Sequence, residues 1–180
     1  MSVKRKTSEN MYKDMIVVNN KKELKELINQ RIREQGLNCD LNDIDVSRVT
    51  DMSELFMSSK FNGDISAWDV SNVKNMSYMF YNSDFNGDLS KWNTSRVRNM
   101  IEMFSYTRFN GDISQWDVSN VKDMRYMFYS SKFDGDISNW NVSNVEDMSF
   151  MFERSVFKGD LSKWDVSNAK NIEEYVWNIR

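Results

Sequence analysis

The chain has 180 residues, no histidine, no proline, one cysteine and a formal net charge of −3. Without histidine it lacks the common general base near neutral pH, every Ser-His or Cys-His nucleophile pair, and imidazole ligands for zinc. A single cysteine excludes an internal disulfide, and neither a GxxxxGK[ST] phosphate loop nor a GxGxxG motif occurs. We therefore expect one soluble domain that is not an enzyme and holds no cofactor or metal.

The first 36 residues predict a tail and a small cap. Residues 1–14 are polar, and we expect a flexible tail. Residues 15–18 read Met-Ile-Val-Val and predict a strand. Residues 21–35 predict an amphipathic helix, because an Asn20-x-x-Glu23 capping box precedes it, Gly36 ends it, and apolar residues share one face. Residues 15–36 would then form a β-α cap that shields the edge of a sheet from association with another chain.

A block of 24 residues repeats five times over residues 61–180, and residues 37–60 hold a degenerate copy. A fixed period between 20 and 50 residues indicates units that bury their apolar faces only by stacking. Residues 37–180 therefore predict a repeat solenoid of six turns. The last block departs from the pattern over residues 172–177, as expected for a terminal repeat.

The repeat predicts ladders of identical buried side chains along the stack. One ladder contains Phe61, Phe85, Phe109, Phe133 and Phe157. A second contains Trp68, Trp92, Trp116, Trp140 and Trp164. A sugar-binding aromatic strip is the alternative interpretation of the tryptophans. We favour the core, because it requires large apolar side chains first.

Within each block we predict a short strand and a short helical or 3₁₀ turn. G-D-I/L-S-x-W is the predicted strand, and stacked copies would form a parallel sheet with strands about 4.8 Å apart. V-x-x-M-x-x-M-F has the spacing of one helical face. The Asn or Asp before this turn is a predicted N-cap, as at Asn75 and Asp123. Five of the six glycines share one repeat position, where we expect a backbone corner.

Cys39 occupies the glycine position of the degenerate first block, and we expect a small buried core residue there. The alternative, a reactive thiol, needs a basic neighbour that the sequence does not show.

One aspartate per block follows the glycine, and copies about 5 Å apart repel by roughly 0.8 kcal/mol in water. We expect each to accept hydrogen bonds from the adjoining backbone or serine, and a row of calcium sites is the alternative. These aspartates are Asp64, Asp88, Asp112, Asp136 and Asp160.

The pattern F-N-G-D-I-S-x-W-D-V-S-N-V-x-x-M-x-x-M-F-x-x-S resembles the repeat of the BspA-like bacterial surface proteins, over residues 37–180. The resemblance implies a curved, leucine-rich-repeat-like solenoid that binds proteins or adheres to cells, often after export. The N-terminus contains no apolar stretch of signal-peptide length, and no run of about 20 apolar residues occurs. We expect a cytoplasmic relative. The alternative is a cell-surface protein whose export signal has been removed.

A binding face is expected where residues vary between blocks while the core stays constant. The residue before tryptophan varies, and two columns in the M-x-x-M-F segment carry aromatic residues. Tyrosines anchor partners well, since they supply a large contact area at low entropic cost. The alternative is that these aromatic side chains cover the outer core. The candidate partner-binding residues are Lys91, Gln115, Asn139, Tyr78, Tyr81, Tyr126, Tyr129 and Phe150.

Charge is divided unequally, with +4 on residues 1–36 and −7 on residues 37–180. This opposes direct nucleic-acid binding through the repeats. We therefore predict a monomeric, non-enzymatic protein-binding module. One alternative is an intracellular inhibitor, carried by a phage or other mobile element, that occupies the basic groove of a nucleic-acid enzyme. The other is a cell-surface adhesin.

Overall fold

The computed structural model describes residues 15–170. Strand β1 spans Ile16–Val17, helix α2 spans Lys21–Gln35, and strand β2 spans Ile44–Asp45. β1 and β2 pair in parallel, with Ile16 opposite Ile44. The predictions for the tail at residues 1–14 and for the terminal segment at residues 172–177 lie outside the described residues.

The predicted helix is confirmed at both ends. The Asn20 side chain accepts a hydrogen bond from the Glu23 backbone N–H at 3.0 Å. Gly36 has a φ of 91° and donates its N–H to the Ile32 carbonyl at 2.9 Å. The side-chain cap at one end and the glycine at the other satisfy backbone groups that a helix leaves unpaired.

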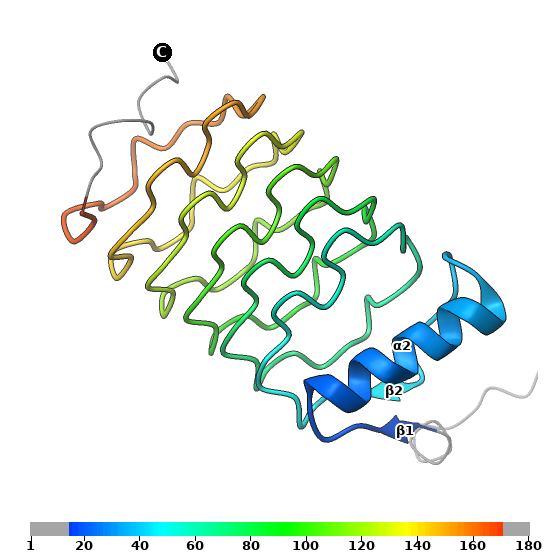
Figure 1. The fold of residues 1–180 in the computed structure, drawn as a ribbon. Coiled ribbons are helices and arrows are strands. Elements are labelled where there is room, and N and C mark those ends of the chain that lie inside the picture. Colours follow the sequence, from blue (N-terminus) through cyan, green and yellow to red (C-terminus); the bar gives the residue numbers. More distant parts are fainter. Residues whose placement is uncertain (1–14, 171–180) are drawn as a thin grey trace, which may run out of the picture.

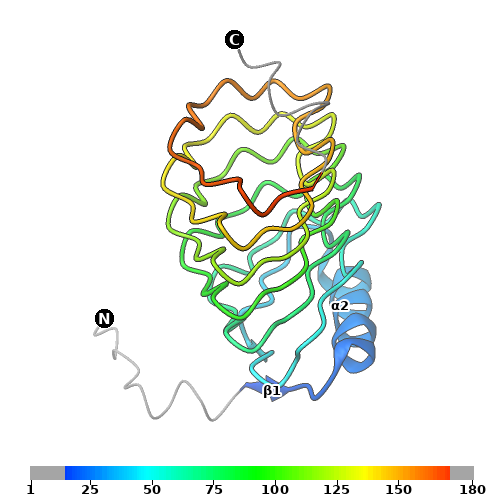
Figure 2. The same ribbon diagram turned by 90° about the vertical axis from the view of Figure 1, so that its left-hand side faces the viewer.

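Helix α2 lies across one end of a stack of turns (Figures 1 and 2). Its buried residues Leu24 and Ile28 belong to the same apolar cluster as the core of the stack. Lys21 Nζ lies 2.7 Å from Ser53 Oγ and 3.3 Å from the Asp51 carboxylate. The helix therefore covers the first turn with an apolar face and fixes its position with polar contacts at the edge.

Residues 37–170 run through wide turns that lie side by side along one axis (Figure 1). Backbone bridges join residues of neighbouring turns in parallel, and most join residues 24 positions apart, the period of the sequence repeat. The bridged column contains Asp51, Asn75, Asn99, Asp123, Asp147 and Lys170. Each turn thus lies directly on the equivalent segment of the next.

The predicted phenylalanine and tryptophan ladders are buried, with every ring 8% exposed or less. The ring centroids of Trp68 and Trp92 are 6.4 Å apart, with 6° between their planes. Each indole N–H donates to a carbonyl of the preceding turn, as from Trp92 to Ile65 at 3.1 Å. This bond satisfies the one polar group of a buried tryptophan. A sugar-binding strip is wrong for these rings, because their faces are covered.

A second phenylalanine ladder lies against the first. Its members come from the M-F end of each block, and Phe80 lies 4.5 Å from Phe85 and 5.6 Å from Phe104 between ring centroids. Stacked aromatic pairs at such distances contribute about 0.5–1.5 kcal/mol beyond the apolar area they bury. The core is therefore a double column of phenylalanines beside a column of tryptophans.

The strand predicted over G-D-I/L-S-x-W is wrong for most of the stack. Only the first pair, Asp40 and Asp64, forms a parallel bridge in this segment. The chain instead bends, and the Trp92 N–H donates to the Leu89 carbonyl at 3.1 Å. An aspartate side chain supports the bend, since Asp88 Oδ1 accepts from the Ser90 N–H at 2.9 Å. A side chain thus satisfies a backbone donor that a strand would have paired with its neighbour.

The predicted helical or 3₁₀ turn is also wrong, because the segment forms β-turns in tandem. Its N–H groups alternate in direction: Tyr78 donates to Ile101 of the next turn at 2.8 Å, whereas Tyr81 donates back to Tyr78 at 3.1 Å. The predicted N-cap Asn75 accepts from the Ser77 N–H at 3.1 Å. Every N–H from residue 76 to residue 83 has an acceptor in this arrangement. The backbone is therefore fully paired without a helix.

The repeated glycine serves close packing. A Cβ at Gly87 would lie 2.7 Å from Cζ of the Phe85 ring, closer than real contacts allow. The expected backbone corner is not the reason, because Gly36 is the one glycine of residues 15–170 with a positive φ. In the first turn the equivalent residue is Cys39, which is buried as predicted, and Leu37 stands where later turns have phenylalanine. The first turn therefore accommodates the Cys39 side chain at the glycine position, because the phenylalanine ring of the later turns is absent there.

Candidate interaction surface

The tandem β-turns form one continuous surface, which we call the turn face. It comprises residues 53–58, 77–82, 101–106, 125–130 and 149–154. All ten non-glycine residues of positive φ within residues 15–170 lie on it, two in each turn. They include Tyr78, Tyr106 and Phe150, with φ of 59°, 57° and 59°. Such conformations cost roughly 1–2 kcal/mol for residues other than glycine, asparagine and aspartate.

Six aromatic side chains of the turn face contact one another across four turns. Tyr81 meets Tyr106 at a centroid distance of 5.7 Å, and Tyr106 meets Tyr129 at 5.3 Å, both edge to face. Tyr78 joins at one end through Tyr81, at 6.0 Å. At the other end Tyr126 contacts Tyr129 at 5.6 Å and stacks on Phe150 at 4.8 Å. We call this set the tyrosine row.

The tyrosine row brings together five of the eight predicted partner-binding residues. They are half-buried, so the row both covers the outer core and presents ring surface to solvent. Tyr106, which the sequence analysis missed, is the most open member at 46% exposure. In that turn the position of Tyr81 and Tyr129 is occupied by Ser105, which is small and buried. Tyr106, the next residue, contacts both of these tyrosines instead. The aromatic row thus shifts by one residue in that turn.

The other three predicted residues, Lys91, Gln115 and Asn139, form a separate exposed column. Each precedes a ladder tryptophan and so belongs to a different bend of the chain from the turn face. The structure therefore divides the predicted site into two surfaces.

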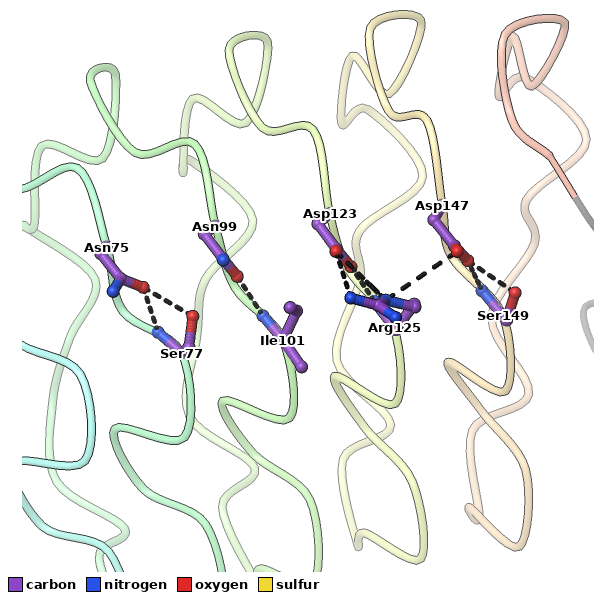
Figure 3. Close-up of polar contacts among 8 residues, drawn as sticks. All are labelled: Asn75, Ser77, Asn99, Ile101, Asp123, Arg125, Asp147 and Ser149. Atoms are coloured by element: carbon purple, nitrogen blue, oxygen red, sulfur yellow. Dashed lines mark hydrogen bonds and ion pairs between the residues drawn. The ribbon is translucent and has the colours of Figure 1, made fainter.

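The bridged Asn and Asp column runs beside the turn face (Figure 3). Arg125 lies between two of its carboxylates, with Nη2 2.8 Å from Asp123 Oδ2 and Nε 3.8 Å from Asp147 Oδ2. Hydrogen bonds from Arg125 to Asp123 raise the pKa of the guanidinium further. In the two preceding turns the column holds uncharged Asn75 and Asn99. Arg125 therefore neutralises the charge where aspartate replaces asparagine.

Glu102 is a turn-face carboxylate that contacts the tyrosine row through the Tyr78 hydroxyl. Burial raises the pKa of Glu102, and a hydrogen bond from Tyr78 lowers it to a smaller extent. Burial, and then the Glu102 charge, raise the pKa of the Tyr78 hydroxyl. Within residues 15–170 no lysine or arginine forms an ion pair with Glu102. Glu102 is thus a half-buried carboxylate that accepts a hydrogen bond from Tyr78 and has no ion-pair partner among the described residues.

A guanidinium already lies on the tyrosine row. Arg154 Cζ lies 5.8 Å from the centre of the Tyr129 ring, within the range of a cation–π contact. Arg154 Nε is also 3.9 Å from Glu153. Arg154 occupies the repeat position that Tyr106 holds two turns earlier. The row therefore accepts either an aromatic ring or an arginine at this position.

The row of predicted aspartates forms the expected backbone bonds. Asp112 Oδ1, for example, accepts from the Ser114 N–H at 2.9 Å, and the same bond recurs in the other four turns. These bonds lower the pKa of each carboxyl. Among the described residues no group of three or more Cys, Asp or Glu is arranged to hold a metal ion.

A search for membrane spans over residues 15–170 finds no helix long and apolar enough to cross a bilayer. The comparison with known families gives a match to Mycoplasma protein of unknown function, DUF285, over residues 22–132 and again over residues 82–180. The two matches together cover most of the chain, which therefore belongs to this family of repeat proteins. No curated protein and no solved structure matches the chain.

Proposed function

We propose that this chain is a non-enzymatic protein-binding module, a leucine-rich-repeat-like solenoid that presents the turn face to a protein partner. The observation that carries the proposal is the placement of bulky aromatic side chains at positive φ on an outer surface. Tyr106 illustrates it, because asparagine would adopt the same backbone more favourably, as Asn82 does one turn earlier. Such local strain is commonly retained where a side chain has a role in binding.

The resemblance to BspA-like surface proteins favours an adhesin as one version of this function. The second version is an intracellular inhibitor that occupies the basic groove of a nucleic-acid enzyme, and the charge of −7 on residues 37–180 supports it. The two versions differ in salt dependence, since an interaction between opposite charges weakens as salt increases. They also differ in the compartment of the partner, cytosol or cell exterior.

The test is site-specific photo-crosslinking on the two candidate surfaces. A benzophenone amino acid is placed at Tyr106 on the turn face in one protein and at Gln115, beside the tryptophan ladder, in another. Each is exposed to source-cell cytosol and to an extracellular-matrix panel, at low and moderate salt, and cross-linked proteins are identified by mass spectrometry. We expect a single adduct from position 106 that excess unlabelled chain removes.

Position 115 is a matched control for position 106, because the side chains of Gln115 and Tyr106 are both exposed. An adduct from position 115 alone would assign binding to the other column and overturn the turn-face proposal. If neither position gives an adduct that excess unlabelled chain removes, a binding role is contradicted for both surfaces. A salt-sensitive cytosolic adduct supports the inhibitor version, and a matrix adduct supports the adhesin version.

A further inference from the structure

The tyrosine row holds one guanidinium and also presents an exposed ring, Tyr106, to solvent. Arg154 rests on Tyr129 from within the chain, 5.8 Å from the ring centre. On the side of Tyr129 that is nearer to helix α2, the row continues through Tyr106 and Tyr81. Within residues 15–170, no lysine or arginine forms a cation–π contact with either of these two rings. Tyr106 is the most exposed of these rings. The exposed Tyr106 ring can therefore accept a guanidinium from another molecule, as the Tyr129 ring accepts the one of Arg154.

A second, independent observation points to the same ligand chemistry. Glu102 precedes Tyr106 by four residues on the same turn, is half-buried, and has no ion pair within residues 15–170. Arg125, the nearest turn-face cation along the chain, is already engaged by Asp123 and Asp147. Glu102 accepts a hydrogen bond from Tyr78 but has no countercharge. A half-buried charge also gains from pairing with an opposite charge, so Glu102 offers a position for an external cation.

The surrounding charge supports a basic partner as well. Residues 37–180 carry a net charge of −7, and the turn face adds no free cluster of lysine or arginine. This charge attracts a basic segment and repels phosphate groups. Among flexible basic side chains, arginine stacks on aromatic rings and pairs with carboxylates through its planar guanidinium, whereas lysine is a hydrated point charge.

We infer that the tyrosine row binds an extended, arginine-bearing segment of the partner protein, with one arginine between the Tyr106 ring and the Glu102 carboxylate. This inference rests on the proposed function and adds the chemistry of the partner. The row crosses four turns, and with about 4.8 Å between neighbours it spans roughly 15 Å. A fully extended segment of about five residues covers that length.

The probe is a fluorescent six-residue peptide that alternates arginine and serine and has blocked ends. Matched peptides replace arginine with lysine or with citrulline, which keeps the shape of arginine and removes its charge. Binding to the full chain is measured by fluorescence anisotropy. We expect the arginine peptide to bind at least about fivefold more tightly than the lysine peptide and more tightly still than the citrulline peptide.

Two variants test the assigned contacts. Tyr106→Asn installs the residue that the preceding turn has at this position, and Glu102→Gln removes the charge while keeping the shape. We expect each to raise the Kd of the arginine peptide about fivefold. The matched control is Asp112→Asn, which removes one acidic charge from the row of backbone-bonded aspartates. Asparagine preserves the bond to the following serine, as Asn93 does with Ser95 at 3.1 Å.

The control Asp112→Asn should leave the Kd unchanged. An equal loss of affinity from Glu102→Gln and Asp112→Asn would overturn the inference, because it would indicate attraction to overall charge. Equal binding of the arginine and citrulline peptides would overturn it too, and so would tighter binding of a single-stranded RNA hexamer. If any of these results occurs while cross-linking from position 106 persists, the proposed function stands and only the chemistry of the partner is wrong.

Discussion

The indole N–H of Trp116 donates to the carbonyl oxygen of Leu89, 27 residues earlier and one turn back, at 3.0 Å. The same bond recurs from each ladder tryptophan, so the tryptophans fix the separation of neighbouring turns by hydrogen bonding as well as by apolar packing. This bond gives the ladder a register that a column of phenylalanines would lack.

Trp116→Ala should therefore destabilise the chain by about 3–5 kcal/mol, the usual cost of truncating a buried tryptophan. Trp116→Phe should cost less, because it keeps an apolar ring but leaves the Leu89 carbonyl without its donor, for about 1–3 kcal/mol. Urea unfolding followed by circular dichroism measures both changes. From the sequence we predict a much smaller loss for Trp177→Ala in the terminal turn, but Trp177 lies outside the described residues. Trp164, which is 8% exposed near the end of the described stack, therefore takes its place in the comparison. Equal losses from Trp116→Ala and Trp164→Ala would contradict the ladder.

Gly87→Ala should destabilise the chain by about 1–3 kcal/mol, because the new Cβ would lie 2.7 Å from the Phe85 ring. Phe85→Leu removes the obstructing ring, and the first turn shows this combination naturally, with Leu37 two residues before Cys39. The double variant should therefore cost less than the sum of the two single variants, a coupling that urea unfolding reveals. Strict additivity would mean that the glycine is needed for another reason.

The sequence predicts those features that depend on residue identity at a fixed spacing. Helix α2 could be predicted because Asn20 and Gly36 mark its ends, and the aromatic ladders because identical side chains recur at a constant period. The conformation within each turn could not be predicted. The M-x-x-M spacing fits a helical face, but it fits i to i+3 β-turns equally well, and the choice depends on backbone bonds to the next turn, such as Tyr78 to Ile101.

The candidate surface was predicted in part for a related reason. Tyr78, Tyr81 and Tyr129 were found as variable aromatic residues in aligned columns. Tyr106 was missed because its contacts cross from one column to another, which an alignment of repeats does not display. One sequence signal would have helped: Tyr106 follows Ser105 in the turn where the regular column lacks its tyrosine.

Ser130→Asn should stabilise the chain by up to about 1 kcal/mol. Ser130 has a φ of 52°, and asparagine adopts this conformation more readily than serine, as Asn82 does at the same repeat position. Ser130→Val should destabilise it by at least about 1 kcal/mol, because a β-branched side chain is least compatible with positive φ. Thermal unfolding measures both, and an equal effect of the two substitutions would show that the backbone relaxes at this position.

Arg125→Ser should destabilise the chain by about 1 kcal/mol at low salt, since Asp123 and Asp147 would then face each other in adjacent turns without a cation (Figure 3). Adding Asp123→Asn should recover most of the loss, because Asn75 followed by Ser77 shows that the uncharged pair forms the same turn. Urea midpoints at low and high salt provide the measurement. The loss from the single variant should shrink at high salt, and a loss independent of salt would assign Arg125 a packing role instead.

Acid should destabilise the stack through the row of aspartates that includes Asp88. Bonds from the Ser90 backbone and side chain lower the pKa of Asp88 in the folded chain, below the value of about 3.9 expected in the unfolded chain. The folded state therefore binds fewer protons, and its extra stability is present above the unfolded pKa and is lost as the pH falls through the folded pKa. Asp88→Asn keeps an acceptor for the serine N–H at every pH. The measurement is the urea midpoint at pH 7, 5 and 3. We expect the midpoint of Asp88→Asn to fall less on acidification than that of the unmodified chain.

The control for charge is Asp84→Asn, which removes an exposed carboxylate elsewhere on the chain. The same loss in the unmodified chain and in Asp88→Asn would assign acid sensitivity to other groups.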